Sequence, residues 1–348
     1  MKKFKFTLFL GILVVFLVAI SPLIARIPSY TIKTNGKLYI VNKLSSSITV
    51  FDLFEGKKIV EIPIKVTPHE PIAIADQNRL VVTNYGTASV SGKSLTVINT
   101  KTNTIEKKID LKESLAPHGI IDFPNSNNVG VVTDLGNDLL EVNIETGEIV
   151  KRILTEQIVS HLVVLHPKKP LAYITNTYSG SVSVINLDLD KVIKIIPCGK
   201  GTEGIDITPN GKEVWVTNIK ENTISIINTE TNKITHTLPT GQESYRLKFS
   251  VDGNYCLVPN SRDGTISVYH TSTKKQIKTI LVRGKVNFIE RFLFHTPRPV
   301  GLLIHPNGLY AFVTNSNANE VIVLDMKTFT IVSTIGTENV PDGMAIVE

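Results

Sequence analysis

The stretch EGIDITPNGKEVWVTNIKENTISIINTETNKITHTLP, residues 203–239, decides the fold, because it reads as strands and turns without a helical pattern. Its segments EGIDIT, EVWVTN, TISIINT and KITHTLP alternate or are continuously apolar, as strands of a sheet packed on both faces are. The dipeptide Asn210–Gly211 is typical of a tight hairpin turn, because both residue types tolerate positive φ angles. The stretch therefore predicts one four-stranded antiparallel sheet.

The unit repeats along the chain. Its second strand ends in a short run that recurs as YIVN, VVTN, VVTD, YITN, WVTN, LVPN and FVTN, with last residues Asn42, Asn84, Asp134, Asn176, Asn218, Asn260 and Asn315. The intervals between these residues are 42, 50, 42, 42, 42 and 55. A period near 40 built only from strand-like runs is typical of a β-propeller with one blade per repeat. Asn and Asp side chains stabilise turns, so we interpret all seven end residues as structural.

The two chain ends are expected to share one blade. The first repeat begins at its second strand, KLYIVN, and the chain ends with PDGMAIVE, which matches the inner-strand pattern of TEGIDIT. An unpaired edge would be a liability, so the C-terminal strand should complete the first blade. The sequence thus predicts an all-β, seven-bladed propeller over residues 27–348, closed by its C-terminal strand.

Residues 1–26 form a separate segment, in which Lys2, Lys3 and Lys5 precede an uncharged apolar run over residues 7–25. This is the pattern of a signal peptide or a membrane-anchor helix, since about 20 apolar residues cross a bilayer. Pro22 after one cleavage site and Leu23 within the other make both sites poor, which favours an uncleaved anchor. Basic residues before the run place the body outside the cytoplasm. We expect an exported, extracytoplasmic protein of the cell envelope, membrane-anchored or secreted.

Composition excludes several classes of protein. The net charge is +6, but four basic residues belong to the leader and the body is close to neutral, so no nucleic-acid partner is expected. Cys198 and Cys256 are the only cysteines and are predicted to be isolated thiols without metal-type spacing. The sequence contains no G-x-S-x-G, H-E-x-x-H, P-loop or dinucleotide-binding motif.

The units YITN followed by VIN, and WVTN followed by IIN with PNGK before it, resemble the repeat of the YVTN family of β-propeller proteins. The resemblance covers about residues 36–348. It implies the propeller fold, and its members include surface-layer and secreted proteins of unknown ligand. Related propellers include the haem-binding domain of a nitrite reductase, a subunit of amine dehydrogenases, and lactonases. A shared fold does not choose among these functions.

Three insertions into the repeat indicate a binding face. They lie at residues 85–94, 112–117 and 283–298, and the last includes NFIERFLFH. Links between blades and loops after the second strand open on one face of a propeller, and repeat proteins commonly bind through the face that carries insertions. The FIERFLF run is predicted to be either a loop against the propeller or an amphipathic contact for a partner or a membrane.

The residues that enter the inner strands should ring the channel mouth on this face. Alignment of the repeats places Glu70, His118, His161, Glu203, Tyr245, Val300 and Asp342 at equivalent positions, with His69, Arg246 and Arg298 beside them. Carboxylates and imidazoles are the groups that bind metals or carry protons. The alternative is a solvated mouth in which polar residues are simply tolerated. His166 and His305 precede prolines at the other end of their strands and are predicted to be turn residues.

Three functions remain open. The first is a non-catalytic binding or scaffold module of the cell envelope, which takes an envelope protein or a small ligand on the insertion-bearing face. The second is a lactonase-type hydrolase that uses His118, His161, Glu203 and Arg298. The third is a haem-binding or electron-transfer propeller, whose haem would be noncovalent because C-x-x-C-H is absent. No cofactor is predicted, and a metal or haem at the mouth is the alternative.

Overall fold

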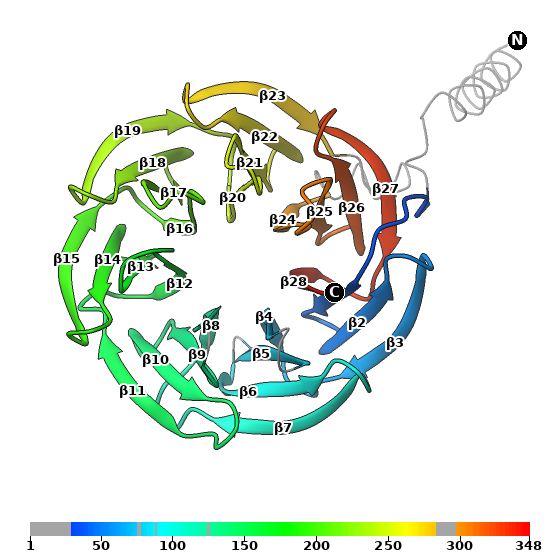
Figure 1. The fold of residues 1–348 in the computed structure, drawn as a ribbon, viewed down its shortest axis with the longest axis horizontal. Coiled ribbons are helices and arrows are strands. Elements are labelled where there is room, and N and C mark those ends of the chain that lie inside the picture. Colours follow the sequence, from blue (N-terminus) through cyan, green and yellow to red (C-terminus); the bar gives the residue numbers. More distant parts are fainter. Residues whose placement is uncertain (1–28, 75–77, 88, 124–125, 283–296) are drawn as a thin grey trace, which may run out of the picture.

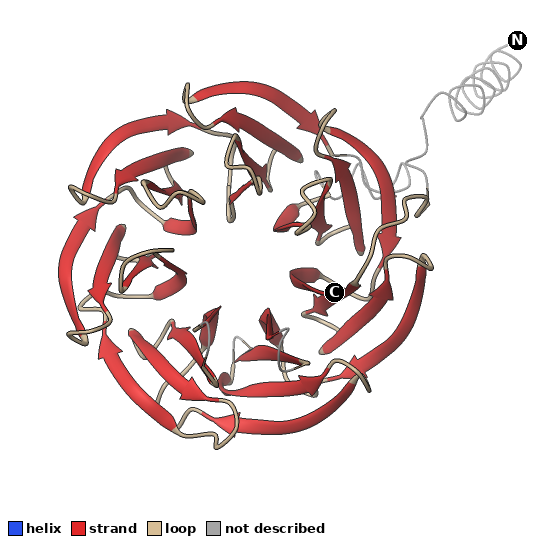
Figure 2. Cartoon of the chain, viewed as in Figure 1, coloured by secondary structure: helices blue, strands red, loops and turns tan. Residues whose placement is uncertain are grey.

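A computed structural model describes residues 29–74, 78–87, 89–123, 126–282 and 297–348. They form seven four-stranded antiparallel sheets that radiate from a central channel (Figure 1). The described part consists of strands and loops without a helix (Figure 2), so it holds no helix that could cross a membrane. The predicted all-β propeller with seven blades is confirmed, whereas the leader at residues 1–26 lies outside the described residues.

Blades are numbered here by the chain order of their second strands. The innermost strands are β28 (Pro341–Val347), β4 (Pro68–Ile74), β8 (Pro117–Asp122), β12 (Ser160–Leu165), β16 (Thr202–Ile207), β20 (Lys248–Phe249) and β24 (Pro299–Ile304). The second strands are β1 (Lys37–Asn42), β5 (Arg79–Gly86), β9 (Asn128–Thr133), β13 (Leu171–Asn176), β17 (Glu213–Asn218), β21 (Tyr255–Asn260) and β25 (Tyr310–Asn315). The third strands are β2 (Ser47–Asp52), β6 (Ser91–Asn99), β10 (Asp138–Asn143), β14 (Ser181–Asn186), β18 (Thr223–Asn228), β22 (Thr265–His270) and β26 (Glu320–Asp325). The outermost strands are β3 (Lys57–Pro63), β7 (Thr104–Asp110), β11 (Ile149–Leu154), β15 (Lys191–Pro197), β19 (Lys233–Pro239), β23 (Lys275–Leu281) and β27 (Thr330–Gly336).

The C-terminal strand closes the ring as predicted. The first blade has the strand order β28-β1-β2-β3, and Leu38 pairs with Ile346 in its ladder. The chain just before β1 strengthens the same junction, because Tyr30 packs edge-on against Phe51 and Ser29 forms a bridge to Thr334 of blade 7. Both ends of the described propeller are therefore fastened where blades 7 and 1 meet.

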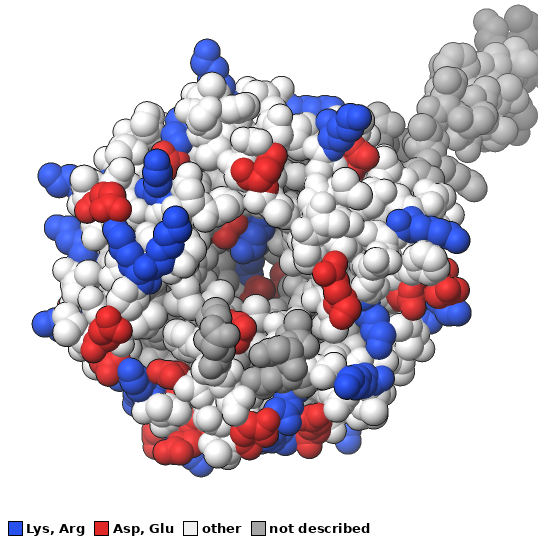
Figure 3. All heavy atoms as spheres, in the orientation of Figure 1, with Lys and Arg blue, Asp and Glu red and all other residues white. Residues whose placement is uncertain are grey.

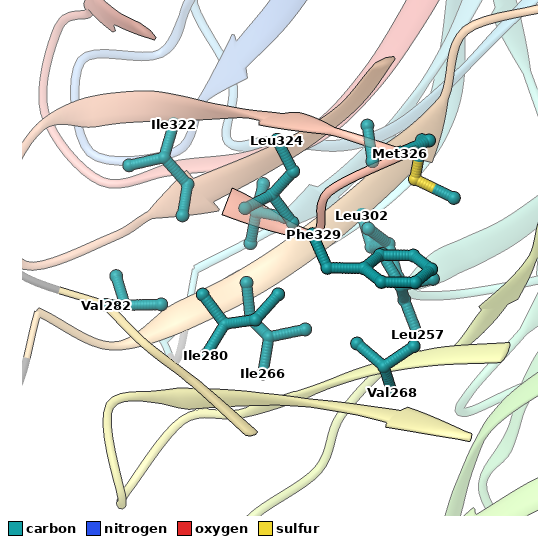
Figure 4. Packing of buried hydrophobic residues seen from close by; sticks show 12 residues of the cluster. Leu257, Ile266, Val268, Ile280, Val282, Leu302, Ile322, Leu324, Met326 and Phe329 are labelled. Carbon is teal, nitrogen blue, oxygen red and sulfur yellow. The ribbon is translucent and has the colours of Figure 1, made fainter. Parts of the chain in front are cut away.

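The hydrophobic core is divided among the interfaces between blades. Figure 4 shows one such cluster, in which Leu257, Ile266 and Val268 of blade 6 pack against Leu302 and Leu324 of blade 7. Each of the seven pairs of neighbouring blades has a cluster of this kind. Burial of apolar surface between sheets contributes about 25 cal/mol per Å² and holds the blades together.

The Asn at the end of the second strand is structural in the repeats that carry it in register. Asn218 Nδ2 donates to Thr223 Oγ1 at 3.0 Å and to Ser225 Oγ at 2.9 Å on the neighbouring strand. Blade 3 departs from this pattern, because Thr133 occupies the corresponding register opposite Asp138, and Asp134 follows one residue later. The interpretation of Asp134 as one of the structural end residues is therefore wrong.

Four further residues, two cysteines and two histidines, have the local roles that the sequence predicts. Cys198 and Cys256 are free thiols that lie in blades 4 and 6. The ring of His166 accepts backbone N–H groups of the turn that follows it, and His305 accepts the N–H of Asn307, so both are turn residues as predicted. Positive and negative side chains are interspersed on the face in Figure 3, around a central hollow.

Candidate functional site

A β-bulge at the mouth end of the inner strands aims side chains at the channel. In blade 4, Ser160 pairs with Asn176 and Val163 with Ile174, so that two residues are left between these pairs. The same shift occurs in blades 1, 2, 3, 5 and 7. A bulge disrupts the alternation of side chains and re-aims them, which is why polar residues gather here.

In these six blades the first bulge position forms the ring that the repeats predict, with one correction, and Tyr245 of blade 6 completes the ring. Pro68 pairs with Asn84, so His69 is the equivalent of His161, and the alignment that placed Glu70 there is one residue off. The ring positions are His69, His118, His161, Glu203, Tyr245, Val300 and Asp342. All of them line a cavity of about 510 Å³, together with Arg246 and Arg298. The structure thus brings together every predicted site residue except Glu70 around this cavity, which we call the mouth pocket.

The second bulge position explains the different place of Glu70. Four blades have glycine there, and a Cβ on Gly301 would lie 2.1 Å from the carbonyl oxygen of Asp342 on the next inner strand. Blade 2 has Glu70 at this position, and blade 6 has Arg246 directly after Tyr245. Arg246 Nη2 lies 2.5 Å from Glu70 Oε1. Their strands β4 and β20 lie on opposite sides of the channel in Figure 1. The ion pair therefore spans the channel.

This ion pair separates the mouth pocket from a second cavity. The second cavity has a volume of about 400 Å³ and is lined by the inner strands, with apolar side chains such as Ile120, Leu162 and Leu302. Arg246 lines both cavities. The mouth pocket therefore has a charged floor, and the channel beyond it is largely apolar.

His161 is held between two carboxylates. Its Nδ1 lies 3.0 Å from Asp134 Oδ1, and its Nε2 lies 2.9 Å from Glu203 Oε1. Tyr85 and Thr177 donate to the second oxygens of these carboxylates, at 3.0 and 3.2 Å. Burial alone would lower the pKa of His161, but Glu203 and Asp134 raise it to about 10. His161 is therefore an imidazolium whose two nitrogens are both occupied.

Sequence reasoning missed Asp134 and Tyr85. Each directly follows the residue that occupies the Asn register of its blade, Thr133 and Asn84 respectively. Lys43, which follows Asn42, also lines the mouth pocket. The usable signal is therefore the position that directly follows the end of the second strand.

His69 and His118 differ from His161 in charge and in hydrogen bonding. Their ring centroids are 4.5 Å apart, and the ring of His118 lies 3.7 Å from that of His161. Burial lowers the pKa of His69 to about 3 and lowers the pKa of His118 well below its usual value. The Nδ1 atom of each ring is buried without a hydrogen-bond partner among the described residues. Both rings are therefore neutral near pH 7 and have unused polar atoms.

Asp342 faces these histidines from the closing strand. Its Oδ2 lies 3.2 Å from Lys43 Nζ and 3.2 Å from His69 Nδ1, although the second contact lacks hydrogen-bond geometry. Burial alone would raise the pKa of Asp342, but Lys43, His69 and Arg246 lower it to about 2. Its Oδ1 is buried without a partner in the described part of the chain. Asp342 is therefore an anion with one oxygen in reserve.

Arg298 and Tyr245 form the other side of the mouth pocket. The guanidinium carbon of Arg298 lies 5.9 Å from the centroid of the Tyr245 ring, within cation–π range. Arg298 is exposed and forms no ion pair with any described carboxylate. This side therefore offers an exposed cation and an aromatic ring at the entrance.

One group of side chains in the site could hold a metal. His69, Glu70 and His118 each offer one ligand atom, and these atoms all lie within 4.8 Å of one another. Two imidazole nitrogens and one carboxylate oxygen are a donor set that suits transition metals.

The insertions are described only in part. Residues 85–94 lengthen the hairpin between β5 and β6, whose ladder continues to the Gly86–Ser91 pair, and Val90 near its tip is exposed. The link over residues 112–117 is ordered by Ser114, whose hydroxyl donates to Asp138 at 2.9 Å. Residues 283–296, with most of the third insertion and the FIERFLF run, lie outside the described residues.

A family model described as "Lactonase, 7-bladed beta-propeller" matches residues 26–281. No curated protein matches the chain. Among solved structures, a functionally unknown protein from Desulfotomaculum acetoxidans DSM 771 is 16% identical with a TM-score of 0.73, over 90% of this chain and 99% of that one. Kuenenia stuttgartiensis hydrazine synthase is 15% identical with a TM-score of 0.68, over 79% and 88% of the two chains. Dihydro-haem d1 dehydrogenase NirN, in complex with DHE, is 12% identical with a TM-score of 0.64, over 89% and 65%. At these identities the likeness to solved structures shows the fold alone.

Proposed function

We propose that this chain, which belongs to the lactonase family of seven-bladed β-propellers, is a non-catalytic binding protein. It holds a small polar ligand in the mouth pocket. One observation carries the proposal. Nδ1 of His69, Nδ1 of His118 and Oδ1 of Asp342 are buried around one cavity without hydrogen-bond partners in the described residues. A buried polar atom without a partner costs about 1–3 kcal/mol, and a ligand that pairs with it recovers this cost.

The arrangement of charges favours binding over hydrolysis. A general base must reach the proton that it abstracts, and a general acid must be free to release one. Both nitrogens of His161 are occupied by Asp134 and Glu203, and Glu70 is paired with Arg246. These acid–base groups pair with one another and hold the walls of the pocket in place, which is the property of a preformed binding site.

Lactone hydrolysis is the second candidate, because the family description favours it. In this function the exposed Arg298 would bind an anionic group of the substrate, and a proton would have to leave His161 through one of its carboxylate partners. The two functions differ in a direct way: hydrolysis releases acid from a lactone, whereas binding leaves the lactone intact.

Haem binding draws support only from likeness in fold to a dihydro-haem d1 dehydrogenase. Neutral His69 or His118 could act as an axial ligand. The absorbance spectrum of the purified protein, before and after addition of haem, decides this alternative without any variant.

The test of the proposed function measures both binding and turnover. Thermal unfolding of the full-length chain is recorded with a panel of small carboxylates, lactones and divalent metal ions, and lactone hydrolysis is followed by acid release. A ligand at 100 times its Kd stabilises the folded state by about 2.7 kcal/mol. We expect stabilisation that His118→Gln reduces and His236→Gln, at an exposed position, leaves unchanged. Lactone turnover that His161→Gln abolishes in a folded protein would instead establish hydrolysis.

We also propose that residues 1–26 export the propeller and anchor it in the membrane, so that the insertion-bearing face meets an envelope partner or ligand. The basic residues and the apolar run of the leader support this location. Cell fractionation tests it: the full chain should sediment with membranes, and a chain that starts at residue 27 should not.

A further inference from the structure

We infer that the histidine side of the mouth pocket binds a divalent first-row transition-metal ion of the zinc class, through one nitrogen each of His69 and His118 and one oxygen of Glu70. The inference rests on the proposed function and names the class of its ligand. The three residues come from the inner strands of two neighbouring blades, β4 and β8. They are the groups that the β-bulges aim at the channel.

The distances among the three ligand atoms are compatible with side chains that move together around an ion. The three ligand atoms lie within 4.8 Å of one another. Around tetrahedral zinc, with bonds of about 2.0–2.2 Å, ligand atoms are about 3.3 Å apart. The ligands therefore have to approach one another by about 1.5 Å at most, which rotation of the side chains supplies.

The bulge in β4 is the reason that two consecutive residues can share one ion. In a regular strand, His69 and Glu70 would point to opposite faces of the sheet. The register shift between Pro68 and Pro71 removes this alternation, so His69 lines the mouth pocket while Glu70 extends across the channel. A two-histidine, one-carboxylate set leaves positions open for water or a further ligand.

The surroundings support these ligands in the manner of a metal site. A ligating imidazole commonly has a carboxylate beside its other nitrogen, and ligating carboxylates are themselves held by donors. Asp342 Oδ2 lies 3.2 Å from His69 Nδ1, so a turn of the ring that brings Nε2 to the ion would also give the unpartnered Nδ1 a carboxylate. Arg246 holds Glu70 through Oε1, which leaves the other oxygen. Small turns of Asp342 and His69 would complete the hydrogen bond that the present geometry lacks.

The imidazole donors also select the ion. Imidazole suits zinc, copper, nickel and iron, whereas calcium and magnesium prefer an all-oxygen set. Repulsion from the neighbouring His161 ring is reduced, because Asp134 and Glu203 contact both of its nitrogens. The site should therefore prefer zinc or copper to calcium by a wide margin.

Titration calorimetry with zinc chloride on the chelator-treated full-length chain tests the inference. We expect one site per chain, at least about 10-fold weaker in His69→Gln and in His118→Gln, given that changes to supporting residues alone cost 10–100-fold. His236→Gln is the matched control, because His236 is an exposed histidine on β19. Zinc affinity that is equal in the wild type and in the His69→Gln, His118→Gln double variant would overturn the site.

A second measurement needs only the wild-type chain and therefore does not depend on whether the variants fold. The electron paramagnetic resonance spectrum of the copper-loaded chain should show coupling to two imidazole nitrogens. Coupling to none or to one would overturn the proposed ligands. If no metal binds but an organic ligand stabilises the wild type and not His118→Gln, the metal inference fails and the proposed function stands. If neither binds at the mouth pocket, both fail.

Discussion

The replacement His161→Gln should weaken the propeller by an amount that depends on pH. The folded-state pKa of His161 is about 10, against an ordinary value of 6.5, because Asp134 and Glu203 contact its two nitrogens. The folded protein therefore binds more protons than the unfolded chain between these values. His161 contributes its full stabilisation below about pH 6.5 and loses it as the pH rises to about 10.

The magnitude follows from the same values. Each pKa unit corresponds to about 1.4 kcal/mol, so the rise from 6.5 to about 10 corresponds to about 5 kcal/mol. Removal of one partner from a buried ion pair costs about 3–5 kcal/mol, because the other charge is left without compensation. Near neutral pH the variant should thus be less stable by about 3–5 kcal/mol, and the difference should decrease steadily towards pH 10.

Trp215 provides the assay, because it is the only tryptophan and is fully buried in β17. Its fluorescence reports denaturant unfolding of the wild type and of His161→Gln at a series of pH values. Comparison of the two proteins cancels the titration of other groups. A difference in unfolding free energy that stays constant from about pH 7 to pH 10 would refute the assignment of His161 as a carboxylate-held imidazolium.

Three further variants test the ring and its channel. Removal of residues 344–348 deletes most of the closing strand, including the buried Met344, whose side chain alone is worth about 2–5 kcal/mol, so we expect aggregation in size-exclusion chromatography. Removal of Glu348 alone should leave elution unchanged. A truncated chain that melts like the full one would contradict closure. Gly301→Ala should lower the melting temperature, because the new Cβ would lie 2.1 Å from the carbonyl oxygen of Asp342 and the clash costs about 1–3 kcal/mol. An unaltered melting curve would show that the two inner strands are farther apart than this distance implies. Arg246→Met should lower the free energy of unfolding by about 3–5 kcal/mol, because it leaves Glu70 unpaired, and Glu70→Gln in the same chain should restore most of this loss. Strictly additive effects in this double-mutant cycle would rule out the cross-channel pair.

Much of the fold could be predicted from the sequence because a propeller repeats one local pattern. The spacing of the YVTN-like runs indicates the number of blades, and the incomplete first repeat indicates the closing strand β28. Both follow from the need of every sheet edge and apolar face to find a partner. The prediction did not require knowledge of side-chain packing, since each blade is built by its own nearby residues.

The candidate site was less accessible to sequence reasoning, because bulges change the register at the mouth. The alignment of repeats predicts Glu70 in the ring position that His69 occupies. The run VVTD resembles VVTN and so predicts a structural role for Asp134, although Thr133 occupies the register of the Asn. An alignment of letters does not reveal a shift of one residue, and such a shift decides which side chain faces the channel.

The contact between Glu70 and Arg246 could not be predicted from the repeat pattern either. The two residues are 176 positions apart and belong to blades that are not neighbours in the ring. Their contact depends on the diameter of the channel and on the lengths of the two side chains, and no repeat pattern encodes these. The sequence could place each residue near the mouth, but only the closed ring brings the two together.

Nuclear magnetic resonance of the histidine side chains tests most directly whether the mouth pocket is the binding site. Spectra of the nitrogen-15-labelled chain are recorded before and after addition of the ligand or metal ion that stabilises it most. The pocket predicts that the signals of His69 and His118 shift and that those of His166, His236 and His305 stay in place. Shifts confined to the latter three histidines, with His69 and His118 unmoved, would contradict it.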